Sequence, residues 1–450
     1  MPDSSKIPCD TLINAAWVLP IAPKNVPLEE ASIAIEGPVI LALGPRAEIE
    51  AAYVAQSTIE LPDHIVLPGL VNAHGHAAMS LFRGLTEDLP LQTWLSDVIW
   101  PLESRLVTPE FVRDGTRLAL AEMIAAGITC FSDMYFFPEV TAEEARLAGV
   151  RAQIAFPIIE FGNAWSTSAE DAIHKGLALH DTYRNDNLVQ VAFGPHSPYS
   201  VSEADLNNVL MYAEELDLNI HIHLHENAQE VADAHKRIGS SWLVYLSELG
   251  MLSPRLQAVH ATQLTTAEIT LLAEAGVQVI HCPHSNLKLA SGICPTTQLL
   301  AAGVNVALGT DGAASNNSLD LLGEARLASL LAKQVDADAA SLPETIALEM
   351  ATLGGARALG LGDTIGSLEP GKSADLIAVD VSAPRFQPLY DPIAQLIHTA
   401  AGSAVSHVWV AGNAVLMDGK LTTLDETSVV TAGKHWQATV NLSPGMNRPA

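Results

Sequence analysis

The sequence predicts an α/β fold, a (β/α)8 barrel with a small β-sandwich formed from both chain ends, and three observations lead to it. Short apolar runs alternate with amphipathic helical stretches through the middle of the chain. A metal-binding or proton-carrying side chain stands at or near the end of each run, where barrel enzymes keep their chemistry. Both chain ends carry short strand-like segments punctuated by glycine and proline.

Eight apolar runs are the expected barrel strands. They are residues 65–73, 127–134, 150–158, 189–194, 218–224, 256–260, 277–281 and 304–309. Helical stretches separate several of them, with Thr, Ser or Asn near their starts and Gly near several ends, as helix caps require. The clearest of these stretches are residues 109–126, 202–216, 227–249 and 265–275.

Strand signals outside the barrel lie at residues 11–19 and 31–35, and again at 374–379 and 405–416. Each end alone has too few strands to bury a core, so we expect the two ends to pair into one sheet-based domain. The expected organisation has three parts. They are the N-terminal part of the sandwich (1–66), the metal-dependent barrel (67–368) and the C-terminal part of the sandwich (369–450).

Acidic residues dominate the charge of the chain. The 51 Asp and Glu residues outnumber 23 Lys and Arg, giving a net charge of -28. Such a field repels phosphate backbones and anionic lipid surfaces, which argues against nucleic-acid and membrane partners. A neutral or cationic small molecule suits it better, although a solvated acidic surface that aids solubility is the plain alternative. No apolar run approaches the roughly 18 residues of a membrane span.

Cysteine usage indicates a reducing compartment. Cys9, Cys130, Cys282 and Cys294 form no C-x-x-C pair and stand mostly in apolar contexts. Neither a disulfide framework nor a thiolate zinc site is therefore indicated. The expected location is the cytoplasm.

Histidines gather at the ends of the first and fifth runs. His74 and His76 leave the first run at i and i+2 and can reach one ion, although such a pair alone is weak support for a metal. In the fifth run His221, His223 and His225 alternate, which predicts that all three face the barrel axis. Buried imidazoles need partners. For His221, the deepest, a packed polar interior role is the preferred interpretation.

Two further strand ends complete the set. His260 ends the sixth run, and Asp311 follows the eighth. Together His74, His76, His223 and Asp311 offer three imidazoles and a carboxylate with a position left for water, which is the catalytic and not the structural pattern of a metal site. A carboxylate at this place can also accept a proton from the activated water.

Two motifs extend this pattern. Residues 67–76 read LPGLVNAHGH, and residues 366–377 read GSLEPGKSADLI. With the strand-end residues they resemble the amidohydrolase superfamily, in the branch of methylthioadenosine/S-adenosylhomocysteine deaminases and triazine chlorohydrolases. The resemblance covers nearly the whole barrel. It implies hydrolytic deamination of 5'-methylthioadenosine, with S-adenosylhomocysteine or adenosine as possible further substrates, to the inosine analogue and ammonia, by a homo-oligomer.

The resemblance also implies the metal ligands, which would be His74, His76, His223 and Asp311. Asp311 would in addition accept a proton from the attacking water and contact the substrate. His196 stands after the fourth strand, where a lysine able to bridge two ions would otherwise be. The likeness therefore points to a single divalent ion, zinc, with iron as the alternative.

Further roles follow from the same resemblance. Glu226 would be the proton-shuttling acid that also contacts the substrate, and His260 would orient the attacking water. Glu103 would accept hydrogen bonds from the ribose hydroxyls, against the alternative of a surface helix residue. His196 would be a second substrate contact. His281 stands where asparagine is frequent in the family, and no catalytic part is assigned to it.

Two alternatives of different kinds remain. The same metal core could deaminate a free base such as guanine or hydrolyse a triazine, with a pocket that ignores ribose. A metal-binding barrel without catalysis could instead serve as an assembly partner, although Glu226, His260 and Asp311 would then have little use. Arg83, Arg151 and Lys288 are candidates for the charged tail of S-adenosylhomocysteine, but the sequence does not locate them at the 5' end.

Overall fold

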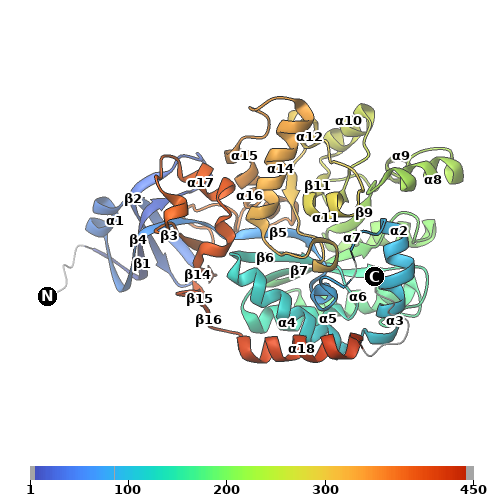
Figure 1. The fold of residues 1–450 in the computed structure, drawn as a ribbon, viewed down its shortest axis with the longest axis horizontal. Coiled ribbons are helices and arrows are strands. Elements are labelled where there is room, and N and C mark those ends of the chain that lie inside the picture. The colour runs from blue at the N-terminus through green and yellow to red at the C-terminus, as the bar shows by residue number, and fades with distance from the viewer. Residues whose placement is uncertain (1–5, 86, 442–450) are drawn as a thin grey trace.

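Two separate eight-stranded sheets organise the protein. The structure, a computed structural model, describes residues 6–85 and 87–441. One sheet has its strands in consecutive order from β5 to β12, with parallel pairing throughout, and the second has the order β16-β15-β14-β13-β4-β1-β2-β3. Figure 1 shows the second sheet at one side of the barrel, with both ends of the chain contributing to it. The predicted fold class is confirmed.

The barrel strands coincide closely with the predicted runs. They are β5 (Leu70–Gly75), β6 (Ile128–Asp133), β7 (Arg151–Ile158), β8 (Val189–Pro195), β9 (Ile220–Leu224), β10 (Leu256–His260), β11 (Gln278–His281) and β12 (Val306–Leu308). The first run differs, because it divides at Gly69 between β4 (Tyr53–Pro68) of the second sheet and β5 of the barrel. A Cβ at Gly69 would lie 2.0 Å from Thr129 Oγ1, so only glycine lets the chain pass this close to β6 where it changes sheets.

Helices pack around the barrel, and one short helix, the first in the chain, packs on the second sheet. Between β3 and β9 they are α1 (Arg46–Ala52), α2 (Leu91–Trp94), α3 (Trp100–Leu106), α4 (Pro109–Ala125), α5 (Pro138–Ala148), α6 (Ala169–Tyr183) and α7 (Glu203–Leu216), with a 3-10 turn η1 (Ala77–Phe82) and a π turn η2 (Leu95–Ile99). The side chains of Thr108, Ser202 and Thr265 cap helices at three of the predicted starts.

The later helices follow the same plan. They are α8 (Ala228–Ile238), α9 (Trp242–Glu248), α10 (Thr266–Ala275), α11 (Pro283–Lys288), α12 (Thr296–Ala301), α13 (Ala313–Asn316), α14 (Leu321–Asp336), α15 (Glu344–Met350), α16 (Leu353–Ala358), α17 (Pro392–His398) and α18 (Glu426–Asn441), with 3-10 turns η3 (Pro384–Phe386) and η4 (Ala401–Ala404). The predicted stretch 227–249 forms two helices, because Gly239 with φ 77° ends α8 in the left-handed region.

The second sheet joins the two chain ends, as predicted. Its other strands are β1 (Ile7–Val18), β2 (Leu28–Glu36), β3 (Val39–Pro45), β13 (Leu376–Asp380), β14 (Val405–Val410), β15 (Asn413–Met417) and β16 (Lys420–Leu421). The junction is the antiparallel pair β13–β4, in which Ile377 lies opposite Leu67. The domain boundaries 1–66, 67–368 and 369–450 stay predictions, and residues 1–5 and 442–450 lie outside the described part of the chain.

After the second sheet the chain returns to the barrel as α18, which lies beside α4 (Figure 1). The Trp436 ring stands edge-on to Phe111 with centroids 5.0 Å apart, and its Nε1 donates to Asp114 Oδ2 over 2.8 Å. The four cysteines are buried and free. None of the described helices combines the length and the hydropathy needed to cross a membrane.

Closure of the barrel brings its last strand against its first. A Cβ at Gly309 would lie 2.8 Å from the Cβ of His74, so only glycine permits this approach. Just beyond it, the Asp311 N–H donates to the His74 carbonyl over 3.1 Å, and Thr310 N–H donates to Asn72 Oδ1 over 2.9 Å. Asp311 is therefore held beside His74 although the sequence separates them widely.

A buried ion pair ties the barrel to the second sheet. Arg151 at the start of β7 donates to both carboxylate oxygens of Asp375, with Nε–Oδ2 2.7 Å and Nη2–Oδ1 3.1 Å. Its Nη1 donates to the Asn187 carbonyl over 2.6 Å, and Nη2 also donates to Ser373 Oγ over 2.8 Å. Both charged side chains are almost fully buried, so each depends on the other for compensation.

We predict that Asp375→Asn lowers the free energy of unfolding by about 3 kcal/mol, because it leaves the Arg151 guanidinium buried and uncompensated. Urea unfolding followed by circular dichroism measures this loss. Glu349→Gln is the matched control, since it neutralises the carboxylate partner of Arg357, whose side chain is 51% exposed. An unfolding midpoint that moves equally in both variants would contradict the prediction.

Candidate metal centre and active site

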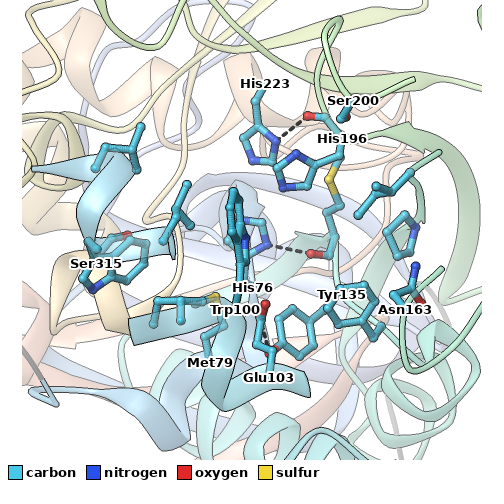
Figure 2. Close-up of a pocket in the computed structure, with 18 of the residues that line it drawn as sticks. His76, Met79, Trp100, Glu103, Tyr135, Asn163, His196, Ser200, His223 and Ser315 are labelled. Atoms are coloured by element: carbon cyan, nitrogen blue, oxygen red, sulfur yellow. Dashed lines mark hydrogen bonds between the residues drawn. The ribbon is translucent and has the colours of Figure 1, made fainter. Parts of the chain in front are cut away.

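Side chains from four strands of the barrel meet at its carboxyl-terminal edge. His74 and His76 come from the end of β5, His223 from β9 and His260 from β10, and Asp311 follows β12. In Figure 2 His76, His223 and His196 lie around one hollow, with Glu103 and Tyr135 near its other side. The structure thus brings together the residues that the sequence singled out from distant segments.

Three of the four expected ligands, His74, His76 and Asp311, have ligand atoms within 4.8 Å of one another, as a metal ion would need. His223 forms a second such group with His74 and His260. Asp311 Oδ1 lies 3.4 Å from His74 Nε2 and 3.3 Å from His76 Nε2. Two ligand atoms bound tetrahedrally to zinc at roughly 2.0–2.1 Å would be about 3.3–3.4 Å apart. The His223 ring lies 5.0 Å from the His74 ring between centroids. The buried His74 Nε2 has no hydrogen-bond partner among the described residues, so this donor set fits an ion.

Backbone carbonyls orient two of the imidazoles. His76 Nδ1 donates to the Met134 carbonyl over 2.6 Å, and His223 Nδ1 donates to the His196 carbonyl over 2.7 Å, both drawn as dashed lines in Figure 2. A carbonyl only accepts, so the proton of each neutral ring sits on Nδ1. The lone pair of each Nε2 is then directed at the ligand cluster, as in histidines that bind metals.

His74 is oriented by side chains instead. Its Nδ1 lies 2.8 Å from Nε2 of His221, whose Nδ1 lies 2.6 Å from Gln257 Oε1. The amide of Gln257 cannot be reversed, because its Nε2 donates to the Ala358 carbonyl over 2.7 Å. His221 Nδ1 must therefore donate, and His221 Nε2 must accept from His74. The sequence predicted a packed polar interior role for His221, and no pattern in it indicated this chain of hydrogen bonds.

The carboxylate of Asp311 is fixed through its own second oxygen. Oδ2 accepts from Ser285 Oγ over 2.6 Å and from Ser315 Oγ over 3.0 Å, and both serines were missed in the sequence. Burial alone would raise the pKa of Asp311, but the adjacent His74 and His76 rings hold it well below its usual range. Asp311 also has φ 60°, a strained backbone of the kind found at functional sites.

His260 has a different hydrogen-bond polarity. Its Nδ1 lies 3.0 Å from Asn286 Nδ2, and with the amide in this orientation the proton of the neutral ring sits on Nε2. Burial lowers the pKa of His260 to about 3, which keeps the ring neutral. A neutral ring with Nε2–H offers a hydrogen-bond donor toward the cluster and not a ligand lone pair. Asn286 was not identified from the sequence.

Glu226 lies at the edge of the ligand cluster. It lines the same cavity as His76, His223 and Asp311. Burial raises the pKa of Glu226 well above its usual range, and the nearby carboxylates of Asp311 and Glu230 raise it further. This raised pKa favours the protonated form of Glu226, which can donate a proton.

Glu103 and His196 line the same cavity of about 1000 Å³. Glu103 Oε1 accepts from the Tyr135 hydroxyl over 2.8 Å (Figure 2). Burial raises the pKa of Glu103 to about 7, although the Tyr135 hydrogen bond opposes this. The His196 ring lies 4.7 Å from the His223 ring between centroids, and burial lowers its pKa well below the usual value. Glu103 lies on helix α3, is partly exposed and lines the cavity, which favours the substrate-contact prediction over the surface-helix alternative.

Two other histidines lie outside the cluster. The prediction that His225 faces the barrel axis is wrong, because its backbone turns into the left-handed region after β9 with φ 53°. Its Nδ1 donates to the Gln263 carbonyl over 2.8 Å, and its Nε2 accepts from Leu243 N–H over 3.3 Å. His281 is buried at the end of β11, and neither metal-binding group among the described residues includes it.

Comparison with known proteins gives a family and close relatives. Residues 65–415 match the model of the amidohydrolase family. A 5-methylthioadenosine/S-adenosylhomocysteine deaminase from Teredinibacter turnerae is 47% identical over 95% of this chain and 97% of its own. One with the same name from Saccharophagus degradans is 46% identical over 97% of this chain and 98% of its own.

Two solved structures are similar to this chain over nearly its whole length. A zinc-bound structure described as an adenosine deaminase from Xanthomonas campestris superposes with a TM-score of 0.96 at 47% identity, covering 97% of this chain and all of that one (100%). A zinc complex of atrazine chlorohydrolase from Arthrobacter aurescens gives a TM-score of 0.89 at 26% identity, covering 95% and 99% of the two chains. The chain therefore belongs to the amidohydrolase family.

Proposed function

We propose that the protein hydrolyses the exocyclic amine of 5'-methylthioadenosine, and of related 5'-substituted adenosines, to give the inosine analogue and ammonia. The observation that carries this proposal is one cavity with two kinds of carboxyl group. Asp311 belongs to the ligand cluster, and Glu226 and Glu103 line the same cavity. Such a cavity can hold a purine and a ribose together. The names of the Teredinibacter turnerae and Saccharophagus degradans relatives support the same substrate.

We further infer that His74, His76, His223 and Asp311 hold one divalent ion, zinc or alternatively iron(II). When bound, the ion would polarise a water molecule and lower its pKa. The spacings around Asp311 Oδ1 support this set, as does the zinc named with two of the similar structures.

The remaining residues of the cluster would move the protons. The Asp311 carboxylate accepts a proton from the attacking water, and the Nε2–H of His260 orients that water by donating to it. Glu226, protonated in its buried position, donates to the ring nitrogen beside the reacting carbon. The C–N bond of the tetrahedral carbon then breaks, and the amine leaves as ammonia with the proton returned by Asp311. The remaining hydroxyl proton passes to Glu226, so that the carbonyl forms and both carboxyl groups regain their starting states. The directions of the pKa shifts favour an ionised Asp311, a neutral His260 and a protonated Glu226, which are the charge states that these roles need.

Glu103 would bind the ribose. A carboxylate can accept from two neighbouring hydroxyls at once, and the Tyr135 hydroxyl holds Glu103 in place through Oε1. His196, which also lines the cavity, would be a second contact to the nucleoside. A free base or a triazine has no ribose for Glu103 to bind, which makes those substrates the weaker alternative. The expected homo-oligomer and cytoplasmic location stay predictions.

The relay from Gln257 through His221 would prepare His74 for the metal. Because Gln257 accepts from His221 and His221 accepts from His74, the Nε2 lone pair of His74 is available in the only tautomer that satisfies all three groups. His221 is accordingly a positioning residue.

The first prediction about this proposed function concerns the reaction itself. Zinc-loaded protein should remove the adenine absorbance band from 5'-methylthioadenosine and release ammonia, while adenine, guanine and atrazine react far more slowly. Absorbance, ammonia and product mass are measured in parallel. Turnover of a free base or a triazine without any nucleoside would contradict the proposal.

Glu226→Gln separates catalysis from metal binding in the same assay. It should retain about one ion per chain by mass spectrometry of the metal content, yet lose roughly 10²- to 10⁴-fold in kcat. His76→Ala should lose the ion itself. Equal activity of Glu226→Gln and the parent would exclude Glu226 as the acid.

The second prediction concerns Glu103 and pH. The carboxylate form accepts from ribose and exists above its pKa of about 7, so KM for the nucleoside should rise as the pH falls below about 7. Glu103→Gln should abolish this acidic limb and lower kcat/KM by roughly 10- to 100-fold.

Tyr135→Phe tests the role of Glu103 while leaving the Glu103 side chain unchanged. Removal of the hydrogen bond that lowers the pKa of Glu103 should move the acidic limb of KM to higher pH. A KM profile that is the same in the parent, Glu103→Gln and Tyr135→Phe would show that Glu103 does not bind the substrate.

The third prediction concerns His221. His221→Leu leaves His74 Nδ1 without its acceptor and should weaken metal affinity by roughly 10- to 100-fold, measured by competition with a chelator. His281→Asn is the matched control, because it also alters a buried histidine on a barrel strand but one outside the metal-binding groups. Equal metal affinity in both variants would exclude the relay.

A further inference from the structure

The charge of the cavity lining bears on which 5' substituent the protein accepts. With the adenine at the metal ligands and the ribose at Glu103, the 5' group must contact the remaining lining. That lining comes from α2, η2, α3 and the loop after β7, among other segments. Its large apolar members include Leu91, Trp94, Leu95, Ile99, Trp100 and Phe161.

No lysine or arginine occurs among the described residues that line the cavity. Its carboxyl groups are Glu103, Glu226 and Asp311, and the proposed reaction uses each of them. The other polar side chains of the outer lining, such as Gln92, are uncharged. A zwitterionic tail would therefore find neither a cation for its carboxylate nor a spare carboxylate for its ammonium group.

The three cations considered from the sequence are engaged elsewhere. Arg83 is paired with Glu122 and also donates to the Asn317 carbonyl over 3.1 Å. Lys288 Nζ lies 2.7 Å from Glu87 Oε2 and is bonded to Asn317 as well.

Arg151 is further removed. It lies at the start of β7, whose other end faces the cavity, and is buried on Asp375. None of these three side chains contributes to the cavity lining, so the charge balance of the cavity is unchanged by them.

We propose that this site selects adenosines whose 5' substituent is apolar and uncharged, such as the methylthio group, and discriminates against the amino-acid tail of S-adenosylhomocysteine. The inference rests on the proposed function. A methylthio group gains from burial, and its sulfur contacts aromatic rings such as Trp94 and Trp100 favourably. A carboxylate placed in the same lining loses water without gaining a partner.

The test compares kcat/KM for three substrates of the zinc-loaded protein. They are 5'-methylthioadenosine, 5'-butylthioadenosine and S-adenosylhomocysteine, of which the second has a long but uncharged tail. We expect the two neutral thioethers to agree within about threefold and S-adenosylhomocysteine to be at least about tenfold poorer. The inhibition constant of S-adenosylhomocysteine against methylthioadenosine turnover should exceed the KM of methylthioadenosine by the same factor.

The possible outcomes distinguish failure of the proposed 5'-substituent selectivity from failure of the proposed function. Equal kcat/KM for S-adenosylhomocysteine and the neutral thioethers would overturn the selection while leaving the deaminase standing. A loss shared by the butylthio compound and S-adenosylhomocysteine would show that length and not charge decides, which also overturns it. If none of the three nucleosides is turned over, the proposed function itself is contradicted.

Discussion

The close approach of β12 to β5 is the constraint on which the rest of the site depends. Gly309 lets the two strands meet at the His74 backbone, and the Asp311 N–H then bonds to the His74 carbonyl. This contact places a carboxylate from the end of the barrel within reach of two imidazoles from its beginning. The same edge receives His223 and His260, because parallel strands end on one side of a barrel.

A second layer of hydrogen bonds makes this convergence chemically specific. Carbonyl acceptors direct His76 and His223, whereas His260 has the side-chain amide of Asn286 as its partner, which in its present orientation gives the opposite tautomer. Neighbouring imidazoles of the same residue type are thus divided into lone-pair donors and a proton donor by their partners alone. Deeper in the barrel, Gln257 accepts from His221 and donates to the Ala358 carbonyl, so these buried polar groups also have partners.

The cavity above this layer has an uneven charge distribution. Its acids and imidazoles gather near the metal ligands and Glu103, and its outer lining is largely aliphatic and aromatic. Cations near the barrel are instead held in ion pairs, as with Arg83 and Lys288. In a chain with a net charge of -28, positive charge is scarce and is used for structure more than for binding.

The sequence by itself determined the order of the elements and the type of chemistry. Short apolar runs that alternate with helical stretches predicted all eight barrel strands, and histidines at strand ends predicted the ligand cluster, because both are local patterns. Only the tertiary structure decided the division of the first run at Gly69 and the turning away of His225. It also decided the roles of Tyr135, Ser285, Asn286 and Gln257 around the site. These depend on contacts between segments far apart in the chain, and no local pattern of residues encodes which distant donor or carbonyl will lie within hydrogen-bonding distance.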